Sequence, residues 1–365
     1  MKPSWTTFII GVLLAATAAF AVDIQLSVTR KTPLKGKLED RVIFGLLKEM
    51  TCDSGGNIFS PSNRKYGSAI NAIVRFPHDA SSFTDFSIDS DDGVNGGTIT
   101  DFDLEPSGEL FALVRQVLKY SDVQEPIEFG KSFLIHYAQS GEIQSRLELK
   151  LDTNNFVPTG IAMLQGGEIL VVGRHTENHK TVVISEVLFQ NGNLKARFAL
   201  NPEGTKSSKT GTIASPRVVE PTAIKANGFV YVLRGTTTEP IRVLSETGQL
   251  LRTIQLKPAD VEFDSPKILG NELIVSEHQP RSDSSYGAVE LGQPRPATLP
   301  IFSLETGEIV DRYLWHHEGG RGLACVTPRS LTFIGQDVSR DATNWAIFEA
   351  VPAGARTTKP SATGR

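Results

Sequence analysis

The sequence predicts an all-β protein made of repeated units of four antiparallel strands. Two kinds of turn alternate along its 365 residues, each between short apolar runs typical of strands. The first is a glycine-centred turn near Gly56, Gly108, Gly167, Gly228 and Gly270, with Arg329 at the corresponding place in the last unit. The second is a polar-polar-Gly turn at Gly141, Gly192, Gly248 and Gly307. Two hairpins repeated in strict order, roughly one pair for every 40 to 60 residues, are typical of a β-propeller. The count predicts six blades.

The second strand of most predicted blades is a nearly continuous apolar run. These runs are residues 111–114, 169–172, 229–233, 273–275 and 331–334. Strands of this kind suit sheets that are covered on both faces, as blades stacked between neighbours are. Residues 39–49 are the one candidate for a short helix, and we rank a helix there below a strand.

The two ends of the chain predict how the ring closes. Residues 344–349 supply one strand after the last glycine-type turn, and the tail at 352–365, rich in Ser, Thr and Pro, is expected to be disordered. The last blade therefore lacks its fourth strand. Residues 22–29 alternate apolar and polar side chains, so we expect an N-terminal strand to complete that blade and cover its edge. Residues 22–351 then form the propeller, with surface loops at 86–97, 201–216 and 279–300.

The N-terminus has the order of a secretory signal peptide. Lys2 precedes an apolar stretch at 8–15, and Ala19-Phe20-Ala21 supplies the small-x-small pattern of a cleavage site. We therefore expect residues 1–21 to be removed. The rival is an uncleaved anchor, but the apolar residues at 8–22 fall short of the roughly 20 that span a bilayer. We expect a secreted or periplasmic monomer with no membrane span after cleavage. A net charge of −4 gives no indication of nucleic-acid binding.

Two units resemble a known repeat family. Residues 157–172 (VPTGIAMLQGGEILVV) resemble the inner hairpin of the NHL-type repeat, and 220–232 (EPTAIKANGFVYV) repeat it more loosely. The resemblance implies a six-bladed, TolB-like propeller. Such propellers include binding scaffolds, lyases and metal-dependent lactonases. Arg174 and Arg234 stand at or near the place of the family's usual Asp, and the lactonase metal ligands have no match in this chain.

Aligning the six glycine-type turns brings polar residues into register at the end of the second strand. The aligned residues are Asn63, Arg115, Arg174, Arg234, His278 and Gln336. We expect them to meet at the channel mouth and to form a positive funnel. An arginine fork suits this role because it holds a carboxylate or phosphate through two parallel hydrogen bonds. The alternative is that each polar residue only marks where an apolar strand emerges into solvent.

The two cysteines also align. Cys52 and Cys325 stand at the same step of the first strand in blades one and six, which ring closure makes neighbours. An exported protein permits a disulfide, although equivalent positions in adjacent blades can exceed the roughly 7 Å Cα limit. A disulfide and two buried free thiols both remain open.

Other candidate motifs are weak. The acidic stretch 89–95 lacks the Gly and Glu of a calcium-binding hand, because Val94 and Thr100 stand there. His175 and His179 follow a strand, so the helical spacing that binds metal is not supplied. We therefore predict a binding module for a small anion, a peptide or a protein, without a cofactor. The alternative is a metal-dependent hydrolase or a lyase in the channel, with a divalent cation such as calcium.

Overall fold

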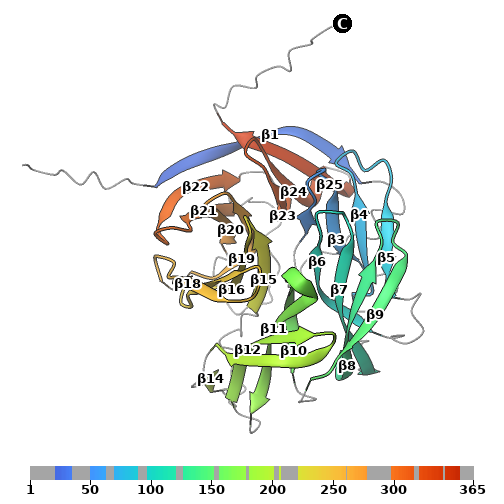
Figure 1. The fold of residues 1–365 in the computed structure, drawn as a ribbon. Helices are drawn as coiled ribbons and strands as arrows, with labels where there is room; N and C mark the ends of the chain where they lie inside the picture. The colour runs from blue at the N-terminus through green and yellow to red at the C-terminus, as the bar shows by residue number, and fades with distance from the viewer. Residues whose placement is uncertain are drawn as a thin grey trace, which may run out of the picture.

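Twisted, mainly antiparallel sheets arranged around a common centre make up the fold (Figure 1). The computed structural model describes residues 21–34, 50–62, 70–88, 97–120, 126–151, 156–177, 181–200, 205–206, 221–259, 261–277, 297–315, 320–339 and 342–353. Within these ranges the strands form one eight-stranded, one five-stranded and three four-stranded sheets. The arrangement is that of an all-β, propeller-like fold, as the repeated hairpins predict.

The first two sheets each contain four consecutive strands. The first consists of β2 (Thr51–Cys52), β3 (Ile58–Ser62), β4 (Ala72–Phe76) and β5 (Thr84–Ser87). The second consists of β6 (Thr98–Leu104), β7 (Leu110–Tyr120), β8 (Pro126–Tyr137) and β9 (Ile143–Leu149).

The next two sheets repeat this order. The third consists of β10 (Val157–Met163), β11 (Glu168–Glu177), β12 (Thr181–Gln190) and β13 (Asn193–Ala199), and the short strand β14 (Thr205–Lys206) also pairs with β12. The fourth consists of β15 (Pro221–Ala226), β16 (Phe229–Arg234), β17 (Ile241–Ser245) and β18 (Leu250–Ile254). A 3-10 turn, η3 (Gln165–Gly167), joins β10 to β11.

The eight-stranded sheet contains the rest of the described strands. Its spatial order is β19 (Phe263–Leu269), β20 (Glu272–Glu277), β21 (Ala297–Ser303), β22 (Ile309–Trp315), β1 (Val22–Pro33), β25 (Ala342–Pro352), β24 (Leu331–Ser339) and β23 (Gly320–Val326). Six separate sheets are therefore not seen among the described residues, because β1 hydrogen-bonds to both β22 and β25 and merges two of the predicted units into one sheet.

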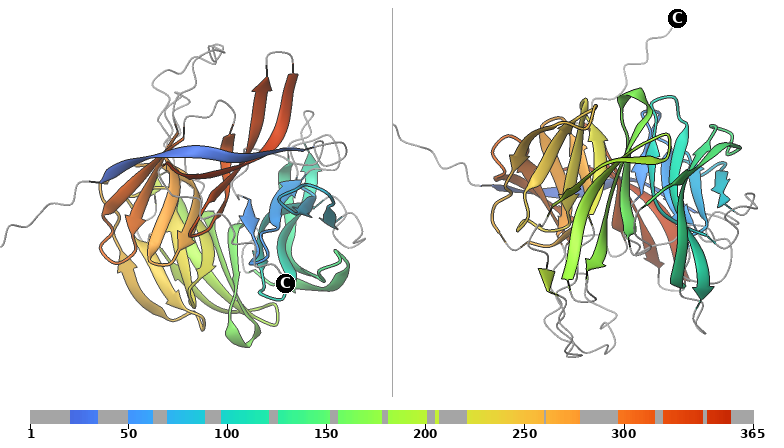
Figure 2. Two further views of the ribbon diagram at one scale, coloured as in Figure 1. Left: turned by 90° about the horizontal axis from the view of Figure 1, so that it is seen from above. Right: turned by 60° about the horizontal axis from the view of Figure 1, so that its bottom comes forward.

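Strand β1 runs across one side of the molecule, from β22 to β25 (Figure 2). Val22 to Gln25 pair in parallel with Asp311 to Leu314. Leu26 to Pro33 then pair antiparallel with β25. One strand thus satisfies backbone donors and acceptors on two neighbouring edges, which would otherwise be open to pairing with another chain.

Both predicted turn families are confirmed. The glycine-type turns join β2 to β3, β6 to β7, β10 to β11, β15 to β16, β19 to β20 and β23 to β24. The polar-polar-Gly turns join β8 to β9, β12 to β13, β17 to β18 and β21 to β22. Gly307 shows why glycine is needed: its φ is 75°, and a Cβ there would collide with the Gln255 carbonyl oxygen.

The hydrophobic core lies between adjacent sheets. Strand β7 alternates between its two neighbours: Val114 packs in the cluster shared with the β2–β5 sheet, and Leu113 packs in the cluster shared with the β10–β13 sheet. Both side chains are fully buried. This two-sided burial explains the nearly continuous apolar runs of the sequence.

The innermost strands contact one another around the centre. Strand β10 contacts β6 and β15, and β23 contacts β2 and β19. Carboxylates on β6 bind the neighbouring backbone: Asp101 Oδ2 accepts from the Ile161 N–H and Asp103 Oδ2 from the Met163 N–H, both at 2.8 Å. Lys225 Nζ of β15 reaches past β10 to Asp103 Oδ2 and to Glu105 Oε1, each at 2.8 Å.

The Lys225 contacts predict a measurable loss of stability on substitution. Burial alone lowers the pKa of Lys225, but the charges and hydrogen bonds of Asp103 and Glu105 outweigh it and raise the pKa above its ordinary value. The contacts of Lys225 with the two carboxylates therefore stabilise the fold at neutral pH. This contribution is lost as the pH rises through the folded-state pKa of Lys225. Lys225→Met should cost about 1–2 kcal/mol, measured by urea unfolding. Lys257→Met, which removes an exposed pair with Glu308, is the control, and an equal loss there would contradict the expectation.

Several segment predictions are corrected or lie outside the described ranges. The loop predicted at 86–97 begins inside β5, because Phe86 and Ser87 still pair with β4. The loop at 279–300 ends too late, since residues from Ala297 onward pair with β22. Strand β25 extends to Pro352, the first residue of the predicted tail. Residues 1–20 of the predicted signal peptide, residues 39–49 and most of 201–216 are not among the described residues. No helix in the described part of the chain is long and apolar enough to cross a membrane.

Candidate functional site

Three of the aligned arginines occupy equivalent positions. Each lies opposite the first residue of the innermost strand of its sheet: Arg115 pairs with Thr98, Arg174 with Val157 and Arg234 with Pro221. Gln336 lies in β24 opposite Trp345. Asn63 and His278 are outside the described residues. The predicted register therefore holds for the three arginines.

The predicted location at strand ends is wrong for two of them. Only Arg234 ends its strand, whereas β7 continues to Tyr120 and β11 to Glu177. The reason is that the hairpins β7–β8 and β11–β12 extend beyond the inner strands that pair with them. Arg115 and Arg174 consequently lie on the flank of a long ladder instead of emerging directly into solvent.

Arg115 is a buried cation. Its relative exposure is 4%, and its Cζ atom lies 3.8 Å from the centroid of the Phe129 ring. The Nε atom is buried without a hydrogen-bond partner, and within the described part of the chain no carboxylate pairs with this guanidinium. Burial, and then the positive charge of Arg174, lower the pKa of Arg115 to about 10. Both effects disfavour the charged form.

Arg174 and Arg234 have different surroundings. Arg174 is half-buried on β11, near enough to Arg115 for its charge to act on it. Arg234 Nη1 is 2.8 Å from Glu239 Oε1, so its charge is already paired. The structure thus brings Arg115 and Arg174 together electrostatically, while Arg234 is largely neutralised. The ring itself stays a prediction, because Asn63 and His278 lie outside the described residues.

Two aromatic residues that the sequence did not point to lie at or next to these arginines. Phe129 on β8 covers one face of Arg115. Phe156 packs against Gly173, where a Cβ would lie 2.7 Å from the ring Cζ, so only glycine fits immediately before Arg174. The one available signal was the glycine inside an otherwise apolar strand, which often marks the close approach of another group.

Metal-ligand candidates are sparse in the described residues. No group of three or more His, Cys, Asp or Glu side chains that could hold a metal is found there. His175 is buried on β11 opposite Val183, whereas His179 and the acidic stretch 89–95 lie outside the described ranges. The cofactor prediction therefore stays a prediction.

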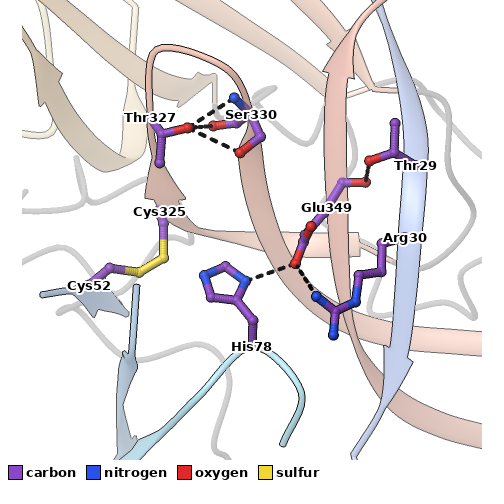
Figure 3. Close-up of polar contacts among 8 residues, drawn as sticks. All are labelled: Thr29, Arg30, Cys52, His78, Cys325, Thr327, Ser330 and Glu349. Carbon is purple, nitrogen blue, oxygen red and sulfur yellow. Dashed lines mark hydrogen bonds and ion pairs between the residues drawn. A yellow bond between two sulfur atoms is a disulfide. The ribbon is translucent and has the colours of Figure 1, made fainter. Parts of the chain in front are cut away.

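A disulfide joins the first and last of the innermost strands. Cys52 of β2 and Cys325 of β23 are bonded, with a Cα–Cα distance of 5.6 Å (Figure 3). This distance is within the range that a disulfide spans. Close by, Glu349 Oε1 lies 3.1 Å from His78 Nδ1 and 3.4 Å from Arg30 Nη1. These polar contacts link the β2–β5 sheet, β25 and β1 at the same seam.

The fold defines the class of protein as propeller-type, and comparison with known proteins agrees at that level. No family model and no curated protein matches the chain. A protein of unknown function from Dyadobacter fermentans is 9% identical with a TM-score of 0.51, covering 90% of this chain and 99% of its own. The endosialidase of phage phi92 is also 9% identical, with a TM-score of 0.50, covering 92% of this chain and 71% of its own. At such identities the likeness shows the fold alone, and the NHL-type resemblance stays a prediction.

Proposed function

We propose that the protein is a binding module that holds an anionic group between Arg115 and Arg174. The observation that carries this proposal is the buried, positively charged Arg115, which is close enough to Arg174 for the two charges to interact and has no carboxylate partner among the described residues. Burying a charge without a counter-charge is costly. A bound carboxylate, sulfate or phosphate would neutralise the Arg115 guanidinium and accept charge-assisted hydrogen bonds from it.

The same proposal includes the finer architecture. Four-strand units beginning at β2, β6, β10, β15 and β19, and a unit of β23 to β25 completed by β1, make a six-bladed propeller. The contacts of β23 with both β2 and β19, and the Cys52–Cys325 bond, support closure of the ring at this point. The N-terminal pattern supports export to the periplasm or the medium. The ligand then approaches from the face on which β7 and β11 extend past the inner strands.

The test is anion binding by the purified protein without its leader. Acetate, sulfate, phosphate and sialic acid are titrated by calorimetry and thermal shift; sialic acid is included because one fold relative is an endosialidase. A ligand at about 100 times its Kd should stabilise the protein by about 2.7 kcal/mol. Arg115→Met with Arg174→Met should abolish this gain.

The matched control is Arg329→Met, which removes an exposed arginine from a turn distant in sequence. It should keep the full response to the anion. Saturable stabilisation that survives in the double variant, or that is lost equally in the control, would reject the site. Metal analysis of the same preparation tests the hydrolase or lyase alternative, which requires a stoichiometric divalent cation or turnover of a sugar substrate.

A further inference from the structure

The first residue of β1 is held by a carboxylate. Val22 begins the strand and lies opposite Asp311 in the parallel pairing with β22. Its backbone N donates a hydrogen bond to Asp311 Oδ1 at 3.3 Å. This contact is independent of the backbone ladder, and it stands at the extreme end of the strand that bridges β22 and β25.

The same residue follows the predicted cleavage site. Ala19-Phe20-Ala21 places the scissile bond between Ala21 and Val22. Val22 is 59% exposed, so the bond that precedes it lies at the surface of the fold. Two independent observations, the cleavage pattern and the start of the docked strand, therefore meet at one peptide bond.

We propose that the Ala21–Val22 bond is a maturation site, and that its hydrolysis creates an α-ammonium group at Val22 that pairs with Asp311. Water adds across the bond: Ala21 leaves with the carboxylate, and Val22 keeps the nitrogen, which takes up a proton at neutral pH. An amide with one hydrogen becomes a cation with three, so the existing hydrogen bond becomes charge-assisted. Cleavage thereby strengthens the attachment of β1.

The surroundings favour a cation at this place. Asp23 on β1 and Asp311 on β22 are the nearest acidic residues along the two strands, and Glu272 on β20 lies in the same sheet. Burial, and then the negative charges of Glu272 and Asp311, raise the pKa of Tyr313, which pairs with Ile24. Arg312 on β22 is the one basic residue in the paired segment. The local balance is therefore acidic, and the new ammonium compensates it.

The consequence concerns how the sheet is held together. Val22 to Gln25 bind β22, and the remainder of β1 binds β25, so this strand joins the two halves of the eight-stranded sheet. A leader that remains attached leaves the Val22 nitrogen uncharged. The strength of this attachment is in this way coupled to removal of the leader.

The docking is tested by titrating the α-amine. Protein that starts at Val22 and carries ¹³C-labelled valine is followed by NMR from pH 6 to 10, with the Val22 Cα shift reporting the titration of the unmodified α-amine. In the Asp311→Asn variant, the α-amine of Val22 should titrate near its ordinary pKa of about 7.7 to 8.0. In the native protein, the pKa of the same α-amine should be about half a unit higher. Glu305→Gln, an exposed acidic residue of the same sheet, is the control and should leave the pKa unchanged. An α-amine pKa that is equal in the native and Asp311→Asn proteins overturns the docking.

The maturation site is tested separately. Full-length protein is expressed with export machinery, and the N-terminus of the product is sequenced; Val22 is expected, and any other start overturns the site. Amide exchange of residues 23–25 should be two- to five-fold slower in the processed protein than in one carrying a Gly-Ser extension. Equal exchange rates contradict the strengthening of β1.

Discussion

Replacing both cysteines by alanine is expected to lower the free energy of unfolding by about 2–5 kcal/mol. Cys52 and Cys325 are separated by 273 residues, so their bond closes a loop that includes nearly the whole described fold. In the chain-entropy model, a loop of this length constrains the unfolded chain more strongly than a short one. The bond also joins β2 to β23, which are otherwise in different sheets. Its loss should weaken the contact between the first and last units.

Urea unfolding measures this effect. Oxidised native protein, reduced native protein and the double alanine variant are compared, and the last two should unfold at similar, lower urea concentrations. Reductant should leave the double variant unchanged, which controls for other effects of reduction. If reduction does not move the midpoint of the native protein, the bond contributes nothing to stability. Alanine is chosen because Cys325 is buried, with 5% exposure, and a larger side chain would not fit.

The repeat of turns was enough to predict much of the fold. Glycines at fixed places in the two turn families, such as Gly108 and Gly141, have positive φ values of 84° and 88°, which L-residues with a side chain rarely adopt. Their spacing therefore marks hairpins directly. Aligning them also placed Arg115, Arg174 and Arg234 in equivalent pairings. A single residue, such as a glycine in a turn, is enough to indicate a local conformational requirement of this kind.

What the sequence did not predict depends on contacts between distant segments. The pairing of Arg234 with Glu239, the cover of Arg115 by Phe129 and the ion pair between Lys225 and Asp103 all depend on side-chain directions. The ends of β7 and β11 were also misplaced, since hairpin length is set by cross-strand pairing and not by where the apolar run stops. Nothing in an apolar run shows that β7 continues through polar residues to Tyr120.

A second large effect is expected at Arg115, and its sign is unusual. Arg115→Met should raise the free energy of unfolding of the ligand-free protein by about 1–3 kcal/mol. The pKa of Arg115 is lowered to about 10 in the folded state, well below the ordinary value of the free side chain, so folding disfavours the charged form. A shift of this size corresponds to roughly 3 kcal/mol, and contact with the Phe129 ring offsets part of it. Methionine fills similar space without a charge.

The pH dependence provides the check on this cause. Because the folded-state pKa of Arg115 is lowered, its positive charge destabilises the fold in full at neutral pH. This destabilisation declines as the pH rises above about 10, because the folded protein then releases the proton before the unfolded chain does. The difference in stability between Arg115→Met and the native protein should therefore shrink between pH 9 and pH 11, in urea titrations of both. A variant that is less stable than the native protein at pH 7 would show that Arg115 has a structural partner. If the variant is more stable and no longer binds the anion, Arg115 is a binding residue that destabilises the ligand-free fold.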